Sequence, residues 1–187
     1  MKNSPYKALV IGFGSIGKRH VRILREMGLT VNVFSRRKLL EENYYENLED
    51  SLKEVDPDYA VIANETSEHY STFKTVLSFE VPQVLVEKPL FSNSVESLPE
   101  SPKSQVSIAY NLRFHPLLQR LYSEIKAQSV LSVQIYVGQY LPDWRPQLDY
   151  RNSYSVSREK GGGVLRDLSH ELDYINWLFG PWQAISA

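Results

Sequence analysis

The sequence of 187 residues contains no cysteine. Disulfide bonds, thiolate catalysis and cysteine-based zinc sites are therefore excluded, and a reducing compartment is compatible with the chain. A hydrophobic run long enough to span a membrane is also lacking. Charge of one sign is not in excess either, since 21 Lys and Arg residues face 22 Asp and Glu residues. Nucleic acid is consequently not an expected partner.

What remains is an ordinary globular composition, with 42% hydrophobic and 23% charged residues. A chain of this length holds one large domain, or one domain and part of a second. An apolar strand follows the first seven residues and leaves no room for a signal peptide. We expect a cytoplasmic protein with no membrane anchor and no metal site.

A glycine-rich turn near the N-terminus organises the chain. The apolar run Ala8–Ile11 leads into Gly12-Phe13-Gly14-Ser15-Ile16-Gly17, and an amphipathic stretch follows. A strand, a glycine turn and a helix in this order predict a dinucleotide-binding site. The first glycine permits a sharp turn, the second permits close approach of a pyrophosphate, and the third lets the helix pack on the strand. The helix N-terminus then faces the phosphates. The alternative is a glycine-rich turn in another α/β domain.

The end of the second predicted strand, Thr30–Phe34, bears on cofactor choice. About 20 residues past the glycines, such domains normally carry an acidic residue that binds the adenosine ribose of NAD. This chain has Ser35-Arg36-Arg37 there. Guanidinium groups match phosphate oxygens, so we predict a preference for NADP over NAD. The alternative is two solvated arginines, with NAD bound through other groups.

Polar residues also follow the next apolar strand, residues 59–63. Carboxyl ends of strands in doubly wound sheets face the ligand crevice. Asn64, Thr66 and His69 are therefore candidate cofactor contacts. For His69 the alternative is a solvent-exposed position in the first turn of a helix.

A further strand, Gln83–Val86, leads into Glu87-Lys88-Pro89. A lysine at a strand end, fixed by a following proline, is well placed for proton transfer. Glu87 and Lys88 are also candidate cofactor contacts.

Three motifs in this order resemble the Gfo/Idh/MocA (glucose–fructose oxidoreductase, inositol dehydrogenase, rhizopine catabolism) family. They are Gly12–His20, Glu87–Pro89 and Gly161–Asp173. The resemblance implies an α/β protein with a Rossmann domain, a doubly wound parallel sheet, over residues 1–110. It implies a partial α/β domain with an open, mainly antiparallel sheet over residues 111–187. It also implies an NAD(P)-dependent dehydrogenase or reductase that acts on the CH–OH group of a sugar or sugar derivative.

The same resemblance implies catalytic roles for Lys88, Asp167 and His170. The family usually spaces the acid and the histidine as D-x-x-x-H, four positions apart, whereas Asp167 and His170 are three positions apart here, with two residues between them. We expect one helix over Val164–Phe179, on which both spacings bring the two side chains to one face.

The second half of the chain supplies candidate substrate contacts. Alternating apolar residues predict a strand over Val130–Tyr140 that begins the open sheet. Arg113 precedes it, and a loop dense in Trp, Tyr and Arg follows. Aromatic faces and guanidinium groups suit an acidic or nucleotide-linked sugar, and the loop resembles a family branch associated with nucleotide sugars. The alternative is an aromatic loop that packs on its own domain. The candidate substrate residues are Arg113, Trp144, Arg145, Tyr150, Asp167 and His170.

The family's second domain normally continues beyond the point where this chain stops. We therefore expect a shortened member or a fragment. In many relatives those further strands supply the subunit interface. The resemblance leaves a homo-oligomer open as the assembly of this chain. Two further readings stay open: a dinucleotide-binding sensor without turnover, and an inactive chain that binds cofactor but builds no substrate pocket.

Overall fold

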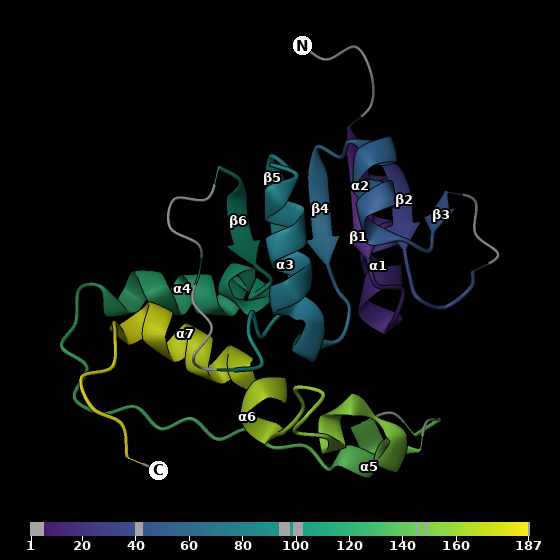
Figure 1. The fold of residues 1–187 in the computed structure, drawn as a ribbon. Coiled ribbons are helices and arrows are strands. Elements are labelled where there is room, and N and C mark those ends of the chain that lie inside the picture. The colour runs from purple at the N-terminus through teal and green to yellow at the C-terminus, as the bar shows by residue number, and fades with distance from the viewer. Residues whose placement is uncertain are drawn as a thin grey trace. The chain divides into compact units, whose positions relative to one another are not determined.

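A computed structural model describes residues 6–39, 43–93, 98, 103–144, 146, 147 and 149–186. The chain forms two compact units (Figure 1). Unit 1 comprises Met1–Ala109 together with Glu159–Gly161, and unit 2 comprises Tyr110–Arg158 and Gly162–Ala187.

Unit 1 is built on a parallel sheet of six strands in the order β3-β2-β1-β4-β5-β6. Its strands are β1 (Lys7–Ile11), β2 (Thr30–Phe34), β3 (Tyr44–Tyr45), β4 (Tyr59–Ile62), β5 (Gln83–Val86) and β6 (Gln105–Ile108). The chain first runs from β1 outward to β3, then returns to β4 on the other side of β1. This reversal defines the doubly wound Rossmann order, and it confirms the predicted fold of the first domain.

Helices cover both faces of this sheet. They are α1 (Ser15–Glu26), α2 (Leu48–Val55) and α3 (His69–Ser78), with a short 3₁₀ helix η1 (Thr66–Glu68) before α3. One core contains Val21 and Leu24 of α1 against one face, and the other contains side chains of α2 and α3 against the opposite face. Because the middle of the sheet is buried on both faces, Ala8–Ile11 of β1 and Ala60–Ile62 of β4 are continuously apolar rather than alternating.

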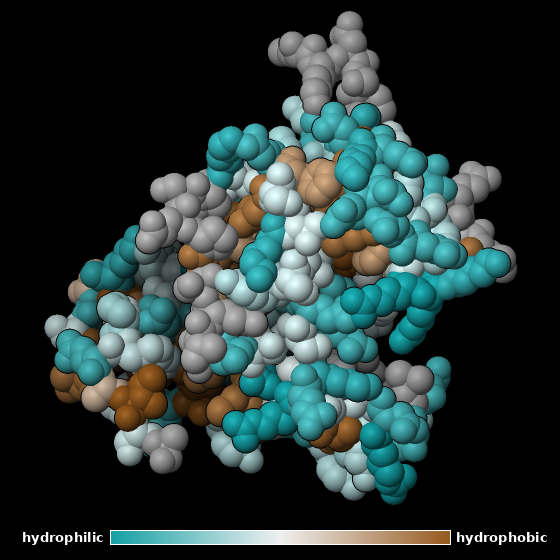
Figure 2. Space-filling model, viewed as in Figure 1, coloured by the Kyte–Doolittle hydropathy of each residue, from teal (hydrophilic) through white to brown (hydrophobic). Residues whose placement is uncertain are grey.

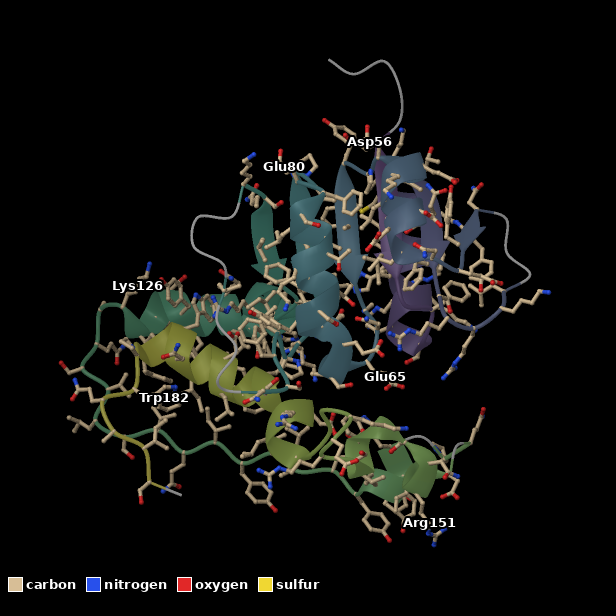
Figure 3. The ribbon with its side chains drawn as sticks, viewed as in Figure 1. Asp56, Glu65, Glu80, Lys126, Arg151 and Trp182 are labelled. Atoms are coloured by element: carbon tan, nitrogen blue, oxygen red, sulfur yellow. The ribbon has the colours of Figure 1, made fainter. Side chains whose placement is uncertain are left out.

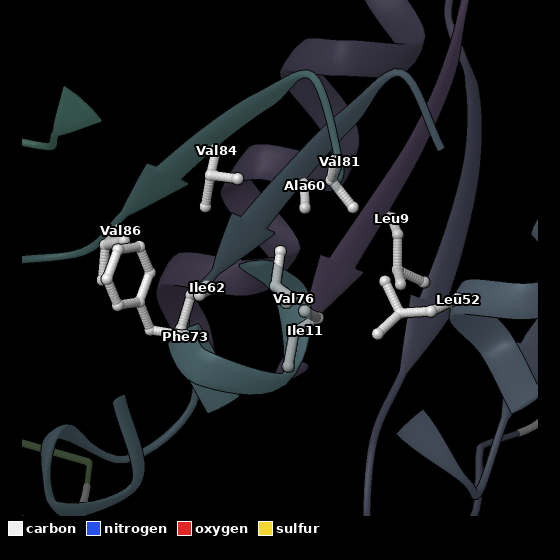
Figure 4. Packing of buried hydrophobic residues seen from close by; sticks show 10 residues of the cluster. All are labelled: Leu9, Ile11, Leu52, Ala60, Ile62, Phe73, Val76, Val81, Val84 and Val86. Carbon is white, nitrogen blue, oxygen red and sulfur yellow. The ribbon is translucent and has the colours of Figure 1, made fainter. Parts of the chain in front are cut away.

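The α2/α3 core shows how the layers interlock (Figure 4). Phe73 of α3 lies beside Ile62 and Val86, which come from neighbouring strands, and Leu52 of α2 lies beside Leu9. All five side chains are at most 2% exposed. This packing fixes the helices on the strands and so fixes the loops that follow each strand.

All strands of unit 1 point the same way, so their carboxyl ends meet at one edge (Figure 1). Asp56 and Glu80, which precede β4 and β5, lie at the opposite edge, whereas Glu65, which follows β4, lies at the carboxyl edge (Figure 3). The glycine turn after β1 therefore shares an edge with the polar residues that follow β2, β4 and β5.

Unit 2 is helical in its described residues. Its elements are η2 (Asn111–Phe114), α4 (Pro116–Ile125), α5 (Leu141–Trp144), η3 (Tyr150–Asn152), η4 (Tyr154–Val156), α6 (Val164–Asp167) and α7 (Ser169–Phe179). The Tyr122 ring of α4 stacks on the Trp177 ring of α7, with centroids 4.6 Å apart. Apolar side chains gather at the surface around these helices, at the lower left of Figure 2.

The predicted strand over Val130–Tyr140 is wrong: this segment has no regular secondary structure. A strand needs a partner for its backbone groups, and every ladder among the described residues belongs to the sheet of unit 1. Leu131 and Tyr136 are 97% and 98% exposed. The expected antiparallel sheet is therefore absent from the described part of unit 2.

The single helix expected over Val164–Phe179 is also wrong. The chain leaves helical geometry at Leu168 (φ −102°, ψ 34°), which separates α6 from α7. Asp167 and Ser169 are both buried. Residues two apart on a straight helix point roughly 200° apart, so the break lets both be buried. It also leaves Leu172, which we expected in the buried stripe, 44% exposed.

No helix in the described part of the chain has the length and hydrophobicity that a membrane crossing requires.

The glycine turn after β1 is held by backbone contacts that exclude side chains. A Cβ atom on Gly17 would lie 2.0 Å from the carbonyl oxygen of Gly12. Gly12 itself has φ +101°, and its Cβ would lie 2.6 Å from the carbonyl oxygen of Ala63 at the end of β4. At Gly14, by contrast, a Cβ would meet nothing within 4 Å.

These contacts predict that two matched glycine substitutions differ in their effect on the free energy of unfolding. Gly17→Ala should lower the free energy of unfolding by about 2–3 kcal/mol, because the backbone must move to admit the methyl group. Gly14→Ala should change it by less than about 0.5 kcal/mol. Chemical denaturation of both variants checks this, and equal stability of the two would contradict the described turn.

A buried histidine joins the ends of β4 and β5. His69 is 1% exposed, so the alternative of a solvent-exposed position is wrong. Its Nδ1 lies 3.0 Å from the carbonyl oxygen of Pro89, and its Nε2 lies 3.2 Å from that of Asn64. Burial lowers the pKa of His69 below its ordinary value of 6.5, although both carbonyls and the charges of Glu87 and Glu68 act in the opposite direction.

The lowered pKa of His69 predicts a pH-dependent stability. Below about pH 6.5 the unfolded chain takes up a proton that the folded chain resists, so the stabilising contribution present above that pH is lost as the pH falls. The decrease should approach, at most, about 1.4 kcal/mol per pH unit. Urea denaturation between about pH 7.5 and 5.5 measures it for the wild type and for His69→Asn, in which this component should vanish.

His115→Asn is the matched control, because His115 is exposed and caps α4 through its Nδ1, a role that asparagine can fill. If His69→Asn retained the full pH dependence of the wild type, another group would be responsible.

Candidate functional site

The glycine turn offers an open, positively polarised surface at the carboxyl edge of unit 1. Gly14 is the N-cap of α1 and has no side chain that could cap the helix. The first helical turn has no acidic residue. The amide groups of such a turn have no partners within their helix, and the helix dipole favours an anion there. Ser15 and Ile16 are exposed beside this opening. The Lys18 ammonium group adds positive charge, 5.3 Å from the centroid of the Phe13 ring.

The space at Gly14 tests whether a dinucleotide fits. An anion can approach the backbone there because no atom lies within 4 Å of a Cβ position. The residues of the turn therefore leave room for a pyrophosphate, and the binding of a pyrophosphate there stays a prediction.

At the end of β2, the three predicted cofactor residues differ in what they contact. Ser35 is buried, and its Oγ accepts a hydrogen bond from the Arg37 amide at 3.1 Å. The hydroxyl group thus shapes the local turn. Arg36 forms an ion pair with Glu68, a residue of η1.

Glu68 is a residue that the sequence reasoning missed. It lies 32 positions from Arg36, so no local motif links the two. Only the sheet topology relates the two residues. Strands β2 and β4 both flank β1, which brings the segments that follow them to the same edge of the sheet.

The segment after β4 is closely packed. Asn64 donates from Nδ2 to Thr72 Oγ1 at 2.8 Å and to Glu68 Oε2 at 3.4 Å. Its Oδ1 is buried and has no hydrogen-bond partner among the described residues. That oxygen is an acceptor suited to a hydroxyl donor of a bound molecule.

Thr66 is buried against a residue of the third motif. A Cβ on Gly161 would lie 2.7 Å from Thr66 Cβ, and Gly161 has φ +86°. Gly161 is part of unit 1, so this glycine packs directly on the loop after β4 within that unit. The packed side of Thr66 faces protein, and a role in cofactor binding stays a prediction.

The lysine after β5 lies between two anchored residues. Glu87 accepts a hydrogen bond at 2.7 Å from His20 Nε2 of α1 when that nitrogen is protonated, and its amide donates to the carbonyl of Ile62 at 2.9 Å. The carbonyl of Pro89 faces His69. The backbone on either side of Lys88 is therefore fixed to α1, β4 and α3. His20, which ends the first motif, was not among the predicted site residues.

Arg113, a predicted substrate contact in unit 2, is engaged within its own unit. Its Nε and Nη2 donate to the Asp173 carboxylate at 2.8 and 2.6 Å. The hydrogen bonds to this carboxylate raise the pKa of Arg113 above its ordinary value. A bidentate pair of this kind fixes the orientation of the guanidinium group.

The aromatic loop is partly described. Trp144 ends α5, and Tyr150 begins η3 with the Arg151 guanidinium 5.0 Å from its ring centroid. Both aromatic side chains are half-buried. Arg145 lies outside the described residues, so its predicted role is not addressed.

Asp167 and His170 lie on either side of the break between α6 and α7. Asp167 is buried, 7% exposed. The His170 and Tyr110 rings lie nearly perpendicular to each other, with centroids 5.7 Å apart, and the Tyr110 hydroxyl donates to Ser169 Oγ at 3.5 Å. Since Lys88 belongs to unit 1 and these two residues to unit 2, a catalytic group of all three stays a prediction.

Within the described residues, no three or more His, Cys, Asp or Glu side chains come together as a group that could hold a metal ion.

Comparison with known proteins identifies the first unit. Residues 6–102 match the family model GFO_IDH_MocA, described as an oxidoreductase family with an NAD-binding Rossmann fold. The chain is also 31% identical over 150 residues to the uncharacterized oxidoreductase sll0816 of Synechocystis sp.. That alignment covers 76% of this chain and 40% of the relative.

Solved structures share the fold at low identity. The WlbA (WbpB) dehydrogenase of Thermus thermophilus, in complex with NAD and UDP-GlcNAcA, has a TM-score of 0.74 and 21% identity over 97% of this chain and 65% of its own. Levoglucosan dehydrogenase, in complex with NADH and levoglucosan, has a TM-score of 0.77 and 19% identity, covering 96% and 55%. The chain thus spans about two fifths of the curated relative's length and less than two thirds of these structures. The family model covers more than half of the chain, which therefore belongs to the Gfo/Idh/MocA oxidoreductase family with its NAD-binding Rossmann fold.

Proposed function

We propose that this chain is an NAD(P)-dependent dehydrogenase or reductase acting on the CH–OH group of a sugar or sugar derivative. The observation that carries this proposal is the glycine turn, open at Gly14 and placed where the strand order reverses beside β1. In open α/β sheets, ligands bind in the crevice at that point. Residues 1–110 form the cofactor domain, and residues 111–187 contribute to the substrate side.

The residues that hold the cofactor follow from the edge on which they lie. Amides of the turn Gly12–Gly17 receive the pyrophosphate, except that of Gly12, which donates to the carbonyl oxygen of Phe34 at 2.8 Å. Asn64 Oδ1 accepts from a hydroxyl group. When bound, the cofactor carries the hydride to or from the substrate carbon. The chain's own task is to place the two reactants and to exchange a proton.

Lys88 and His170 are the candidate proton carriers. In the oxidative direction one of them accepts the proton of the substrate hydroxyl, and in the reductive direction the same group returns it. Asp167 orients its neighbours. Arg113, Trp144, Arg145 and Tyr150 contact the substrate, with Arg113 already oriented by Asp173.

The substrate class is supported by the structural relatives. One of them was solved in complex with NAD and UDP-GlcNAcA, and another in complex with NADH and levoglucosan. A sugar-like small molecule is accordingly the proposed substrate of this chain, and a homo-oligomer is its proposed assembly.

The proposed cofactor preference is for NADP, through Arg36 and Arg37 and the adenosine 2′-phosphate. Calorimetric titration of the purified chain with NADPH and NADH tests both the site and the preference. We expect NADPH to bind more tightly, and Arg36→Ala combined with Arg37→Ala to reduce NADPH affinity about tenfold or more, since charge-assisted pairs are lost. NADH affinity should change less than threefold, or about 0.65 kcal/mol.

Absence of binding by either cofactor would contradict the proposed function. Unchanged NADPH affinity in the double variant would contradict only the phosphate-binding role.

Lys88→Met separates the catalytic role from binding. This variant should bind cofactor within a few-fold of the wild type and lose at least about a hundredfold in turnover of any substrate found by screening. Full turnover by Lys88→Met would contradict the acid–base role.

A further inference from the structure

A carboxylate reaches across the first strand of unit 1 toward the arginine expected to bind phosphate. The Glu68 Oε1 atom pairs with Arg36 Nη1, and its Oε2 receives a hydrogen bond from Asn64 Nδ2 at 3.4 Å. The Glu68 side chain is 26% exposed, whereas that of Arg36 is 72% exposed. The carboxylate is thus the more buried member of this ion pair, and the guanidinium group is the more exposed one.

The sheet topology explains this meeting. Arg36 follows β2 and Glu68 follows β4, and these strands lie on opposite sides of β1. Their loops flank the glycine turn that follows β1. A dinucleotide on that turn would place its adenosine ribose near the end of β2, within the field of both side chains.

The chemistry of the two cofactors differs there in one group. A ribose 2′-hydroxyl is a hydrogen-bond donor, which a carboxylate accepts. A 2′-phosphate carries only acceptors and negative charge, so a neighbouring carboxylate repels it. Its interaction with Arg36 would also displace the bond that Arg36 makes with Glu68.

We propose that Glu68 is a specificity-determining residue for the cofactor: it competes for Arg36 and thereby reduces the preference for NADP over NAD. The inference rests on the proposed function. In NAD-binding domains an acidic residue at the end of β2 accepts a hydrogen bond from the adenosine ribose. In this proposal Glu68, which follows β4, takes over that function.

Glu68→Gln tests the proposal, because it removes the charge and keeps the size of the side chain. In calorimetric titrations at low salt, the ratio of NADPH to NADH affinity should rise about three- to tenfold over the wild type, the range expected for a partly exposed charge. The rise should shrink as salt is added.

Glu65→Gln is the matched control. Glu65 lies three residues before Glu68 at the same edge (Figure 3), is exposed, and carries the same charge. Its removal should leave the ratio within twofold of the wild type. An equal rise in Glu65→Gln and Glu68→Gln would mean a general effect of charge and would overturn the proposal.

Arg36→Ala completes a double-mutant cycle. In an Arg36→Ala background the effect of Glu68→Gln on the ratio should fall by at least half, because the competition is gone. Glu68→Ala should reproduce the effect of Glu68→Gln and serves if the glutamine variant folds poorly. An unchanged ratio in a folded Glu68 variant, with both cofactors still binding, would overturn this inference alone, whereas loss of all binding to the wild type would overturn the proposed function with it.

Discussion

The geometry of unit 1 depends on the close approach of Gly17 to the carbonyl group of Gly12, where an added Cβ atom would lie 2.0 Å from the oxygen. It requires the chain to leave β1 and enter α1 with no side chain at the crossing point. Because α1 then starts beside the strand, its first amides lie at the carboxyl edge of the sheet. The open position at Gly14 and the absence of an acidic residue in the first turn leave that helix start open to an anion, as the proposed dinucleotide site requires.

The order of the strands brings the other polar groups to the same edge. Arg36 and Glu68 approach from the two sides of β1, and Glu87 is tied to His20 on α1. The two ring nitrogens of His69 contact carbonyl oxygens in the loops after β4 and β5. The residues on both sides of Lys88 are therefore fixed by contacts with buried or half-buried partners, which is the kind of support that a positioned proton carrier needs.

Much of unit 1 could be predicted from the sequence, because its signals are local or periodic. Apolar runs mark strands buried on both faces, and the glycine spacing marks the turn between β1 and α1. The ion pair of Arg36 with Glu68 could not be predicted, since it joins residues far apart in sequence. The sequence around His69 is typical of an exposed helix start. His69 is buried because it lies between the segments that follow two strands. In unit 2, alternation at residues 130–140 predicted a strand, but alternation cannot supply the partner that a strand requires, and helical spacing after Gly163 did not reveal the break at Leu168.

Amide hydrogen exchange in the presence and absence of NADPH tests the central claim, that the turn after β1 is the dinucleotide site. Saturating cofactor should slow exchange at the amides of Gly14–Gly17, because the first amides of a helix have no acceptor within that helix. Exchange should also slow in the loops after β2 and β4. The core strands should change little, since they are already protected. Protection confined to unit 2, or no change at the glycine turn under conditions where binding is independently measured, would contradict the account.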